Sequence, residues 1–195
     1  MRFVIMADGK GTRWDNYMGI PKHLAEVDGE PILGRTVRLL NEMTGGSAEV
    51  IVTSHDERYE FTGSRRHEPL DNKLEIDRFT AELIEDDTCF LYGDTYYTEE
   101  ALKTILGTET DDMIFFGNTK SIVAVKIKDS RLFKEHVKNV KDLYMAGKIE
   151  RCVGWQVYQS FTGQDFGKRA VPAEKFISLG EKTTDFNTPE EYKKI

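Results

Sequence analysis

The chain has 195 residues, and its 34 acidic against 27 basic side chains give a formal net charge of −7 at neutral pH. This length suits one substantial α/β core, so we expect a single domain over residues 1–195. The acidic balance argues against a nucleic acid polymer or an anionic membrane as partner, since both require a net basic face.

Cysteine content and hydropathy indicate the cellular compartment of the protein. Cys89 and Cys152 lie far apart in the sequence, so we expect two reduced packing residues rather than a disulfide. No apolar run approaches the length of a signal-peptide core or a membrane span. We therefore expect a soluble, cytoplasmic protein.

The first residues combine an apolar run with a basic loop that contains glycine. Residues 3–6 are typical of a buried strand, and they lead into residues 7–13, Ala-Asp-Gly-Lys-Gly-Thr-Arg. Glycine permits positive φ and removes the Cβ, so backbone N–H groups can surround phosphate oxygens, and positive charge comes from Lys10, Arg13 and Lys22. The loop indicates a phosphate-bearing ligand, but taken alone it fits an ordinary strand-to-helix turn equally well. Its spacing matches neither a Walker-type loop nor a dinucleotide-binding fingerprint.

A helix and a second strand follow this loop. Pro31 suits the first position of a helix that ends at Gly45-Gly46, and apolar residues recur between them at helical spacing: Leu33, Val37, Leu40 and Met43. Residues 48–53 are short, β-branched and typical of a buried strand. Strand, helix and strand in this order predict a parallel sheet, with a ligand cleft beyond the carboxyl ends of its strands.

The middle of the chain contains a second buried strand that ends in an acidic residue. Residues 56–73 are irregular and polar, and we predict a loop over the cleft. A short helix is predicted from Ile76, Phe79 and Leu83, and the apolar run 88–92 then predicts a strand that leads into Gly93-Asp94. Another helix begins at Thr98-Glu99-Glu100, where its acidic residues suit the positive end of the helix dipole.

The last third of the chain is predicted with less detail. Strands are predicted at 113–116 and 121–127, a long amphipathic helix at 130–145, and further strands at 154–161 and 175–179. Thr188, Pro189 and Glu191 form a capping box, so a last helix begins there. Asp185 and Asn187 stand just before this helix, where both side chains can point into the cleft.

Asp94 is a candidate metal ligand because it follows a buried strand at the predicted cleft. A single carboxylate in that place is equally typical of a residue that caps the next helix. Mg²⁺ needs only a few protein oxygens and takes its other ligands from water and substrate phosphates, so Asp94 with either Asp185 or Asn187 would suffice. Together with the basic loop, these residues are typical of a phosphoryl-transfer site.

Several motifs together resemble those of the nucleotidyltransferases that join a nucleoside triphosphate to a sugar phosphate or phospho-alcohol, the cytidylyl-, uridylyl- and thymidylyltransferase-like family. They are Ala7-x-Gly9-x-Gly11-Thr12-Arg13, Pro21-Lys22-x-Leu24, Gly29-x-Pro31-Ile32, Gly93-Asp94 and Asp185-Phe186-Asn187-Thr188-Pro189-Glu190. The resemblance spans nearly the whole chain. It implies a Rossmann-like three-layer α/β/α fold with a mostly parallel central sheet.

The resemblance also implies roles for individual residues. Arg13 would neutralise the β- and γ-phosphates, Lys22 would contact the α-phosphate or the incoming phosphate, and Asp94 would bind Mg²⁺ with Asp185 or, slightly favoured, Asn187. The nucleotide would be held by Ala7, Asp8, Gly9, Lys10, Gly11 and Thr12, and its base would be read near Asp71, Asn72 and Lys73. A phosphate oxygen of the acceptor would attack the α-phosphorus and release pyrophosphate. A phosphate monoester is already ionised at neutral pH, so no general base is required and the lack of a catalytic histidine counts for little.

Two departures from the family pattern leave questions open. Asp8 stands where a second glycine or an alanine is usual, so it would lower nucleotide affinity, recruit a cation or bind a ribose hydroxyl. Residues 14–18 replace the usual apolar-proline pattern, which implies a different lid. We slightly favour CTP with a small phosphorylated acceptor, used to make a surface polysaccharide or lipid precursor. The alternative is a non-catalytic nucleotide-binding module of the same fold.

Overall fold

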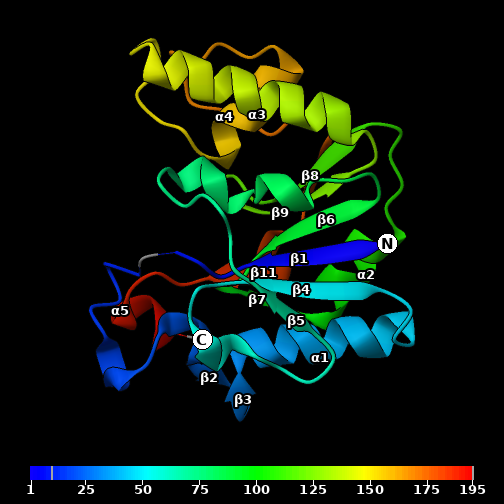
Figure 1. Ribbon diagram of the computed structural model, residues 1–195, viewed down its shortest axis with the longest axis vertical. Helices are drawn as coiled ribbons and strands as arrows, with labels where there is room; N and C mark the ends of the chain where they lie inside the picture. The colour runs from blue at the N-terminus through cyan, green and yellow to red at the C-terminus, as the bar shows by residue number, and fades with distance from the viewer. Residues whose placement is uncertain (10, 195) are drawn as a thin grey trace.

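The computed structural model describes residues 1–9 and 11–194, and a seven-stranded sheet runs through its centre (Figure 1). The strand order is β10-β8-β9-β6-β1-β4-β5. Only β9 runs antiparallel to its neighbours, so the prediction of a mostly parallel sheet is confirmed. The strands are β1 (Arg2–Met6), β4 (Glu49–Thr53), β5 (Arg65–His67), β6 (Thr88–Tyr92), β8 (Met113–Gly117), β9 (Ile122–Ile127) and β10 (Phe176–Ser178).

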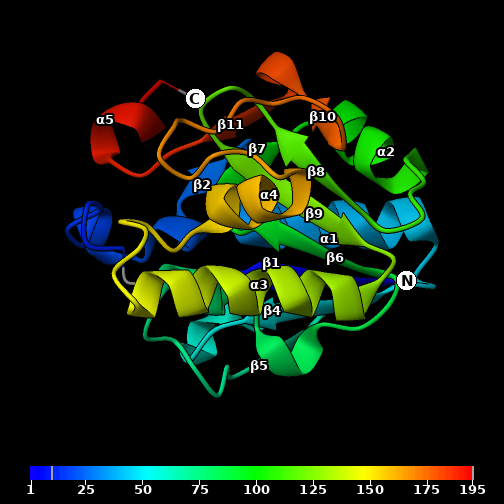
Figure 2. The same cartoon turned by 90° about the horizontal axis from the view of Figure 1, so that it is seen from above.

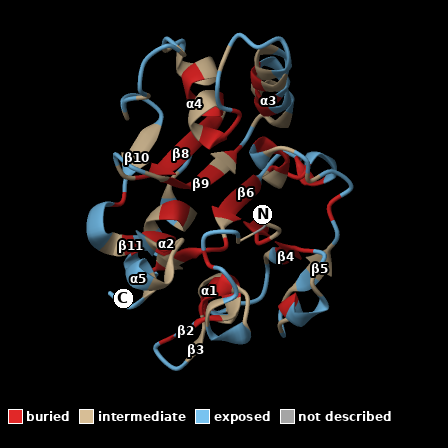
Figure 3. Cartoon of the chain, turned by 90° about the vertical axis from the view of Figure 1, so that its left-hand side faces the viewer, coloured by how far each residue is buried: buried red, intermediate tan, exposed pale blue. Residues whose placement is uncertain are grey.

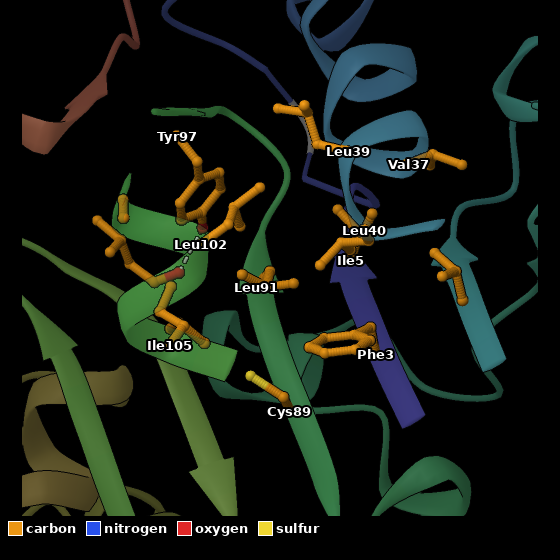
Figure 4. Close-up of a cluster of buried hydrophobic side chains, with 14 of the residues drawn as sticks. Phe3, Ile5, Val37, Leu39, Leu40, Cys89, Leu91, Tyr97, Leu102 and Ile105 are labelled. Carbon is orange, nitrogen blue, oxygen red and sulfur yellow. Dashed lines mark hydrogen bonds between the residues drawn. The ribbon is translucent and has the colours of Figure 1, made fainter. Parts of the chain in front are cut away.

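Strand β1 is buried on both faces, which explains its unbroken apolar sequence. Phe3 and Ile5 pack into one apolar cluster with α1 (Ile32–Thr44) and α2 (Glu99–Gly107), as Figure 4 shows. Val4 and Met6 face the opposite side, where a second cluster includes residues of α3 (Ser130–Met145) and α4 (Gly154–Thr162). Alternate side chains of one strand therefore serve two separate cores.

The helices form two layers that enclose the sheet. In Figures 1 and 2, α3 and α4 lie on one face of the sheet, and α1 lies on the other. Figure 3 shows the buried residues gathered in the strands and in the inward sides of the helices. The predicted three-layer α/β/α arrangement is confirmed.

Two small antiparallel ladders complete the fold at the carboxyl end of β1. Strands β2 (Glu26–Val27) and β3 (Glu30–Pro31) are joined by a tight turn in which Asp28 and Gly29 both have positive φ, at 57° and 82°. Strands β7 (Thr95–Tyr97) and β11 (Thr183–Asp185) pair next to the short helix α5 (Pro189–Tyr192). Short 3₁₀ helices occupy Tyr17–Gly19, Lys22–Leu24, Glu57–Tyr59, Glu75–Arg78, Ala81–Leu83 and Gly180–Lys182.

Most predicted elements are present, and some differ. Helices α1, α2, α3 and α5 and strands β1, β4, β6, β8, β9 and β10 lie where the pattern predicted them, and α5 begins with the predicted capping box. The segment predicted as a strand at 154–161 is the helix α4, because Val157, Tyr158 and Phe161 also match helical spacing and Gly163, with φ of 68°, ends the helix.

Several shorter elements also differ from the prediction. Residues 65–67 were predicted as a loop but form the edge strand β5. Their side chains are basic and show no strand pattern, and the strand is held to β4 by backbone hydrogen bonds. The single helix predicted around Phe79 is two 3₁₀ turns, although Ile76, Phe79 and Leu83 are buried as predicted. Strands β2, β3, β7 and β11 were not predicted, because each has at most three residues.

Two further predictions concern the cysteines and the lack of a membrane span. Cys89 and Cys152 are both free and buried, as expected. None of the described helices has both the length and the apolar character that a bilayer crossing requires.

Candidate active site

The loop after β1 lies beside α5 at one end of the sheet in both Figure 1 and Figure 2. The Ala7 N–H donates to the Thr53 carbonyl at 3.2 Å, and Gly11 has φ of 58°, which an L side chain rarely adopts. Residues Ala7, Asp8, Gly9 and Gly11 line a pocket of about 530 Å³, and Gly9, Gly11, Thr12 and Arg13 line an adjoining one of about 100 Å³. Lys10, also predicted to hold nucleotide, lies outside the described residues.

Lys22 is the buried cation of the site. It begins the 3₁₀ turn that follows Pro21, and only 8% of its surface is exposed. Its ammonium group forms an ion pair with Asp94 and donates to Asn187 Oδ1 at 3.2 Å. Arg13 Nη2 donates to the same Asn187 oxygen at 2.9 Å. Four predicted site residues from three distant parts of the chain therefore meet at one point.

The β7–β11 ladder explains why the two acidic segments meet. Asp185 stands opposite Thr95 in this ladder, and the Phe186 N–H donates to the Asp94 carbonyl at 3.4 Å. Asp185 and Asn187 therefore line the same pocket of about 160 Å³ as Asp94. The ladder brings one end of the chain to the carboxyl end of β6.

Asp94 is a buried carboxylate that stays ionised at neutral pH. Burial by itself would raise its pKa, but the nearby positive charge and hydrogen bond of Lys22 outweigh burial and hold the pKa below its usual value. The residue is 9% exposed. Its charge is therefore available for a cation or for holding Lys22 in place.

The oxygen atoms of this site suit a hard divalent cation. Asp94 and Asn187 both direct an oxygen at the Lys22 ammonium, so two protein oxygens already converge on one positive charge. One carboxylate oxygen of Asp185 accepts a hydrogen bond from Ser121 Oγ at 3.0 Å. Across residues 1–9 and 11–194, no three acidic, histidine or cysteine side chains form a metal-binding group. A Mg²⁺ ion held here would thus take most of its ligands from phosphate and water, as Mg²⁺ commonly does.

Asp8 is held in place by hydrogen bonds from two other segments. Its carboxylate accepts hydrogen bonds from the His55 backbone N–H at 3.0 Å and from His55 Nδ1 at 2.8 Å. Asn72 Nδ2 donates to the same carboxylate at 2.7 Å and to the Asp8 carbonyl at 2.8 Å. The negative charge is therefore used to join the loop after β1 to the ends of two other segments.

The three residues predicted to read the base are placed differently from one another. Asn72 contacts Asp8, whereas the side chains of Asp71 and Lys73 pair with each other at 3.1 Å and are largely exposed. Neither of these two lines a pocket that contains the loop after β1. Base reading by residues 71–73 stays a prediction.

Several residues at the site were not predicted from the sequence. Arg78 lines both of the pockets that Arg13 lines, and its guanidinium lies 3.2 Å from the position that a Cβ on Gly9 would occupy. His55 lines the larger pocket, and Ser121 and Arg151 line the pocket of Asp94. These residues belong to turns and segment ends, where no periodic pattern marks them.

His23 lies beside the site and is a buried packing residue. The Tyr59 hydroxyl and His23 Nδ1 are hydrogen-bonded at 2.9 Å, and the two rings meet edge to face. Burial lowers the pKa of His23 to about 3 despite the nearby charge of Asp94, while Lys22 and Arg78 lower it further. The imidazole is therefore neutral over the physiological range.

Comparison with known proteins gives similarity in structure but not in sequence. The sequence matches no protein-family model and no curated protein. Among solved structures, the CTP:phosphocholine cytidylyltransferase from Streptococcus pneumoniae is 14% identical with a TM-score of 0.56, covering 99% of this chain and 96% of that one. An inositol-1-phosphate CTP transferase from T. maritima is 13% identical with a TM-score of 0.58, covering 97% and 90%. A UDP-glucose pyrophosphorylase in complex with UDP-glucose is 13% identical with a TM-score of 0.61, covering 98% and 95%. The chain therefore has the α/β fold of nucleotidyltransferases over nearly its whole length.

Proposed function

We propose that this protein is a Mg²⁺-dependent nucleotidyltransferase that moves a nucleoside monophosphate from a nucleoside triphosphate to a small phosphorylated acceptor and releases pyrophosphate. The observation that carries the proposal is the meeting of Arg13, Lys22, Asp94 and Asn187 at the carboxyl end of the sheet. The fold supports it, because solved structures of nucleotidyltransferases share this fold over nearly the whole chain.

The reaction balances without a general base. An oxygen of the acceptor phosphate forms a bond to the α-phosphorus, the bond from that phosphorus to the pyrophosphate oxygen breaks, and pyrophosphate leaves with its negative charge. In this proposal Lys22 contacts the α-phosphate or the incoming phosphate, and Arg13 neutralises the β- and γ-phosphates. The work of the protein is to bring two anions together and to stabilise the charge that spreads over the phosphates.

The residues around Lys22 keep this cation in place before substrates bind. Asp94 and Asn187 hold its ammonium group between them, so little reorganisation is needed when phosphate arrives. Bound Mg²⁺ would supply further positive charge to the phosphates, and Asp94 with Asn187 or Asp185 would hold it. Asp94 and Asn187 contact Lys22, so a bound Mg²⁺ ion would share these residues with the ammonium group.

We also propose which nucleotide and which class of acceptor the protein uses. We propose CTP as the donor and a sugar phosphate or phospho-alcohol as the acceptor, with a precursor of a surface polysaccharide or lipid as the product. Two of the similar structures described above carry CTP in their names, and one is named for UDP-glucose.

Pyrophosphate release tests the proposal directly. The purified protein is incubated with each of CTP, UTP, dTTP, ATP and GTP, together with glucose 1-phosphate, glycerol 3-phosphate or phosphocholine, in Mg²⁺ or in EDTA. We expect release that needs both substrates and Mg²⁺ and that is fastest with CTP. Nucleotide binding without pyrophosphate release from any pair would favour the non-catalytic binding module instead.

A further inference from the structure

A hollow of about 660 Å³ opens beside the candidate active site. Three segments form its walls: the turn 118–121 between β8 and β9, the segment 148–151 after α3, and the segment 166–170 after α4. Trp155, in the first turn of α4, also lines it. Lys120, Arg151 and Trp155 line this hollow and the pocket of Asp94 alike, so the two are adjacent.

The charge of this hollow is opposite to that of the protein. Its lining contains one carboxylate, Glu150, against five basic side chains, while the whole chain has a net charge of −7. The basic residues are Lys120, Lys148, Arg151, Lys168 and Arg169. Positive charge that is concentrated in a hollow of an acidic protein attracts anions to that place.

Most of these basic side chains form no ion pair with the carboxylates of the described residues. Within the part of the chain that the structure describes, Lys120, Lys148 and Arg151 have no carboxylate at salt-bridge distance. Lys168 lies 3.8 Å from Asp165, and both of these side chains are mainly exposed. The charge therefore remains available to a ligand.

Hydrogen bonds hold the walls of the hollow together. Asn118 Oδ1 accepts from the backbone N–H groups of Lys120 and Ser121, at 2.8 and 2.9 Å. Arg169 Nη2 donates to the Thr119 carbonyl at 2.9 Å, which links the segment after α4 to the turn. Trp155 stacks on Phe176 with centroids 5.6 Å apart. The hollow is thus largely formed before any ligand binds.

From this arrangement we infer that the acceptor carries a second anionic group, a carboxylate or a further phosphate, which binds in this hollow at Lys168 and Arg169. The inference rests on the proposed function, since the reacting phosphate of the acceptor is placed near Asp94. Arg13, Lys22 and Arg78 already supply positive charge beside Asp94, so the basic residues of the hollow exceed what one phosphate needs. A neutral sugar would leave this charge unused, and a quaternary ammonium group would be repelled by it.

Matched pairs of acceptors test the inference by binding, measured by isothermal titration calorimetry in Mg²⁺ without nucleotide. Glucuronic acid 1-phosphate differs from glucose 1-phosphate, and 3-phosphoglycerate from glycerol 3-phosphate, by a carboxylate in place of a CH₂OH group. Glucose 1,6-bisphosphate tests a second phosphate. We expect at least one compound with the second anionic group to bind about tenfold more tightly than its partner without it, with a difference that shrinks as salt rises.

Two double variants locate the effect, and a third provides a control of equal charge. The preference should fall to about twofold or less in Lys168→Gln/Arg169→Gln and also in Lys148→Gln/Lys168→Gln, which leaves the Arg169–Thr119 bond intact. It should persist in Arg131→Gln/Lys134→Gln, two exposed positions of α3. Equal binding of the compounds with and without the second anionic group, or a preference that survives both hollow variants, would overturn the inference. Acidic preference without pyrophosphate release from any donor would reject the proposed reaction but keep the anion site, so the two failures are distinguishable.

Discussion

The indole ring of Trp14 packs against the phenyl ring of Phe186, with the two ring centroids 5.8 Å apart. Both side chains are buried, and Tyr17 and Tyr192 pack around the indole. Trp14 follows Arg13 directly, and Phe186 precedes Asn187. The aromatic contact therefore positions the two residues whose side chains meet at 2.9 Å, Arg13 Nη2 and Asn187 Oδ1.

We expect Trp14→Ala to lower both stability and pyrophosphate release. Loss of a buried tryptophan typically lowers the free energy of unfolding by about 3–5 kcal/mol. Asn187 would also lose its fixed place relative to Arg13, so kcat should fall. Urea unfolding and pyrophosphate release are the measurements, with Trp14→Phe as the control that keeps an aromatic ring. A Trp14→Ala protein that is less stable but fully active would show that this cluster has no positioning role.

Removal of either member of the Lys22–Asp94 ion pair is expected to abolish product formation. Lys22→Ala removes the charge next to the reacting phosphates, and loss of one such preorganised donor typically costs about 10²–10³ in kcat. Asp94→Ala leaves Lys22 buried without its carboxylate, and breaking a buried pair in this way typically costs about 3–5 kcal/mol of stability. Thermal unfolding must therefore accompany the kinetics.

A matched control separates this effect from a general change of surface charge. Lys182 also pairs with a carboxylate, Glu100, but the pair lies outside the candidate site. Lys182→Ala should leave pyrophosphate release close to that of the unaltered protein. Unchanged release by folded Lys22→Ala or folded Asp94→Ala would exclude the proposed roles of these residues.

Asp8→Ala is expected to raise the KM for the nucleotide more than it lowers kcat. Asp8 accepts hydrogen bonds from His55 and Asn72, so its loss would free two segments at the nucleotide side of the site. Loss of hydrogen bonds to a charged group typically costs about 1.5–3 kcal/mol, which corresponds to about tenfold or more in KM if the cost appears in binding. Asp8→Asn keeps one acceptor oxygen and should show a smaller effect. Tighter nucleotide binding by Asp8→Ala would instead mean that repulsion of phosphate is the main effect of Asp8.

Local patterns predicted the layers of this fold but not the shortest elements. The apolar run of β1 and the spacing of Leu33, Val37 and Leu40 are direct signs of a buried strand and a packed helix, and both are present. At α4, strand-favouring side chains and helical spacing coexist in one sequence, and tertiary packing decides between them. Strand β5 depends on backbone pairing to β4, which no side-chain pattern records.

The candidate site also combines residues that the sequence predicted with residues that it did not. Arg13, Lys22, Asp94 and Asn187 belong to motifs with fixed spacing, so they could be named from the sequence, and they meet in the structure. His55 and Arg78 reach the site from segments whose sequences carry no motif. Their approach depends on how distant segments fold over the loop after β1, and a single sequence holds no local signal of that.

Gly93 is expected to tolerate no side chain. A Cβ at this residue would lie 2.9 Å from the Met6 carbonyl oxygen and 3.3 Å from His23 Cδ2. Gly93→Ala should therefore force β6 and β1 apart at the site and lower the free energy of unfolding by about 1–3 kcal/mol. Gly107→Ala is the matched control, because a Cβ there meets nothing within 4 Å. Equal stabilities of the two variants in urea unfolding would contradict this close approach.

His23 is expected to make the protein less stable as the pH falls below neutrality. Burial lowers its pKa to about 3 in the folded protein, from a usual value of 6.5. Between these two values the unfolded chain binds a proton that the folded protein does not, so the free energy of unfolding decreases as pH falls, by up to about 1.4 kcal/mol per pH unit. The loss should begin near pH 6.5 and end near pH 3.

Urea unfolding between about pH 5.5 and about pH 6.5 measures this effect, because carboxylates with lowered pKa values, such as Asp94, take up protons in the unfolded chain only below about pH 5. His23→Asn retains a group that can hydrogen-bond to Tyr59 but cannot gain a proton, so its stability should depend less on pH across the window. His136→Asn is the comparison at a site between α3 and α4: burial also lowers the pKa of His136, so this variant should reduce the pH dependence in the same direction. Equal pH dependence of the unaltered protein and His23→Asn would mean that His23 takes up a proton inside the folded protein, and that the buried group next to Lys22 and Asp94 does not stay neutral.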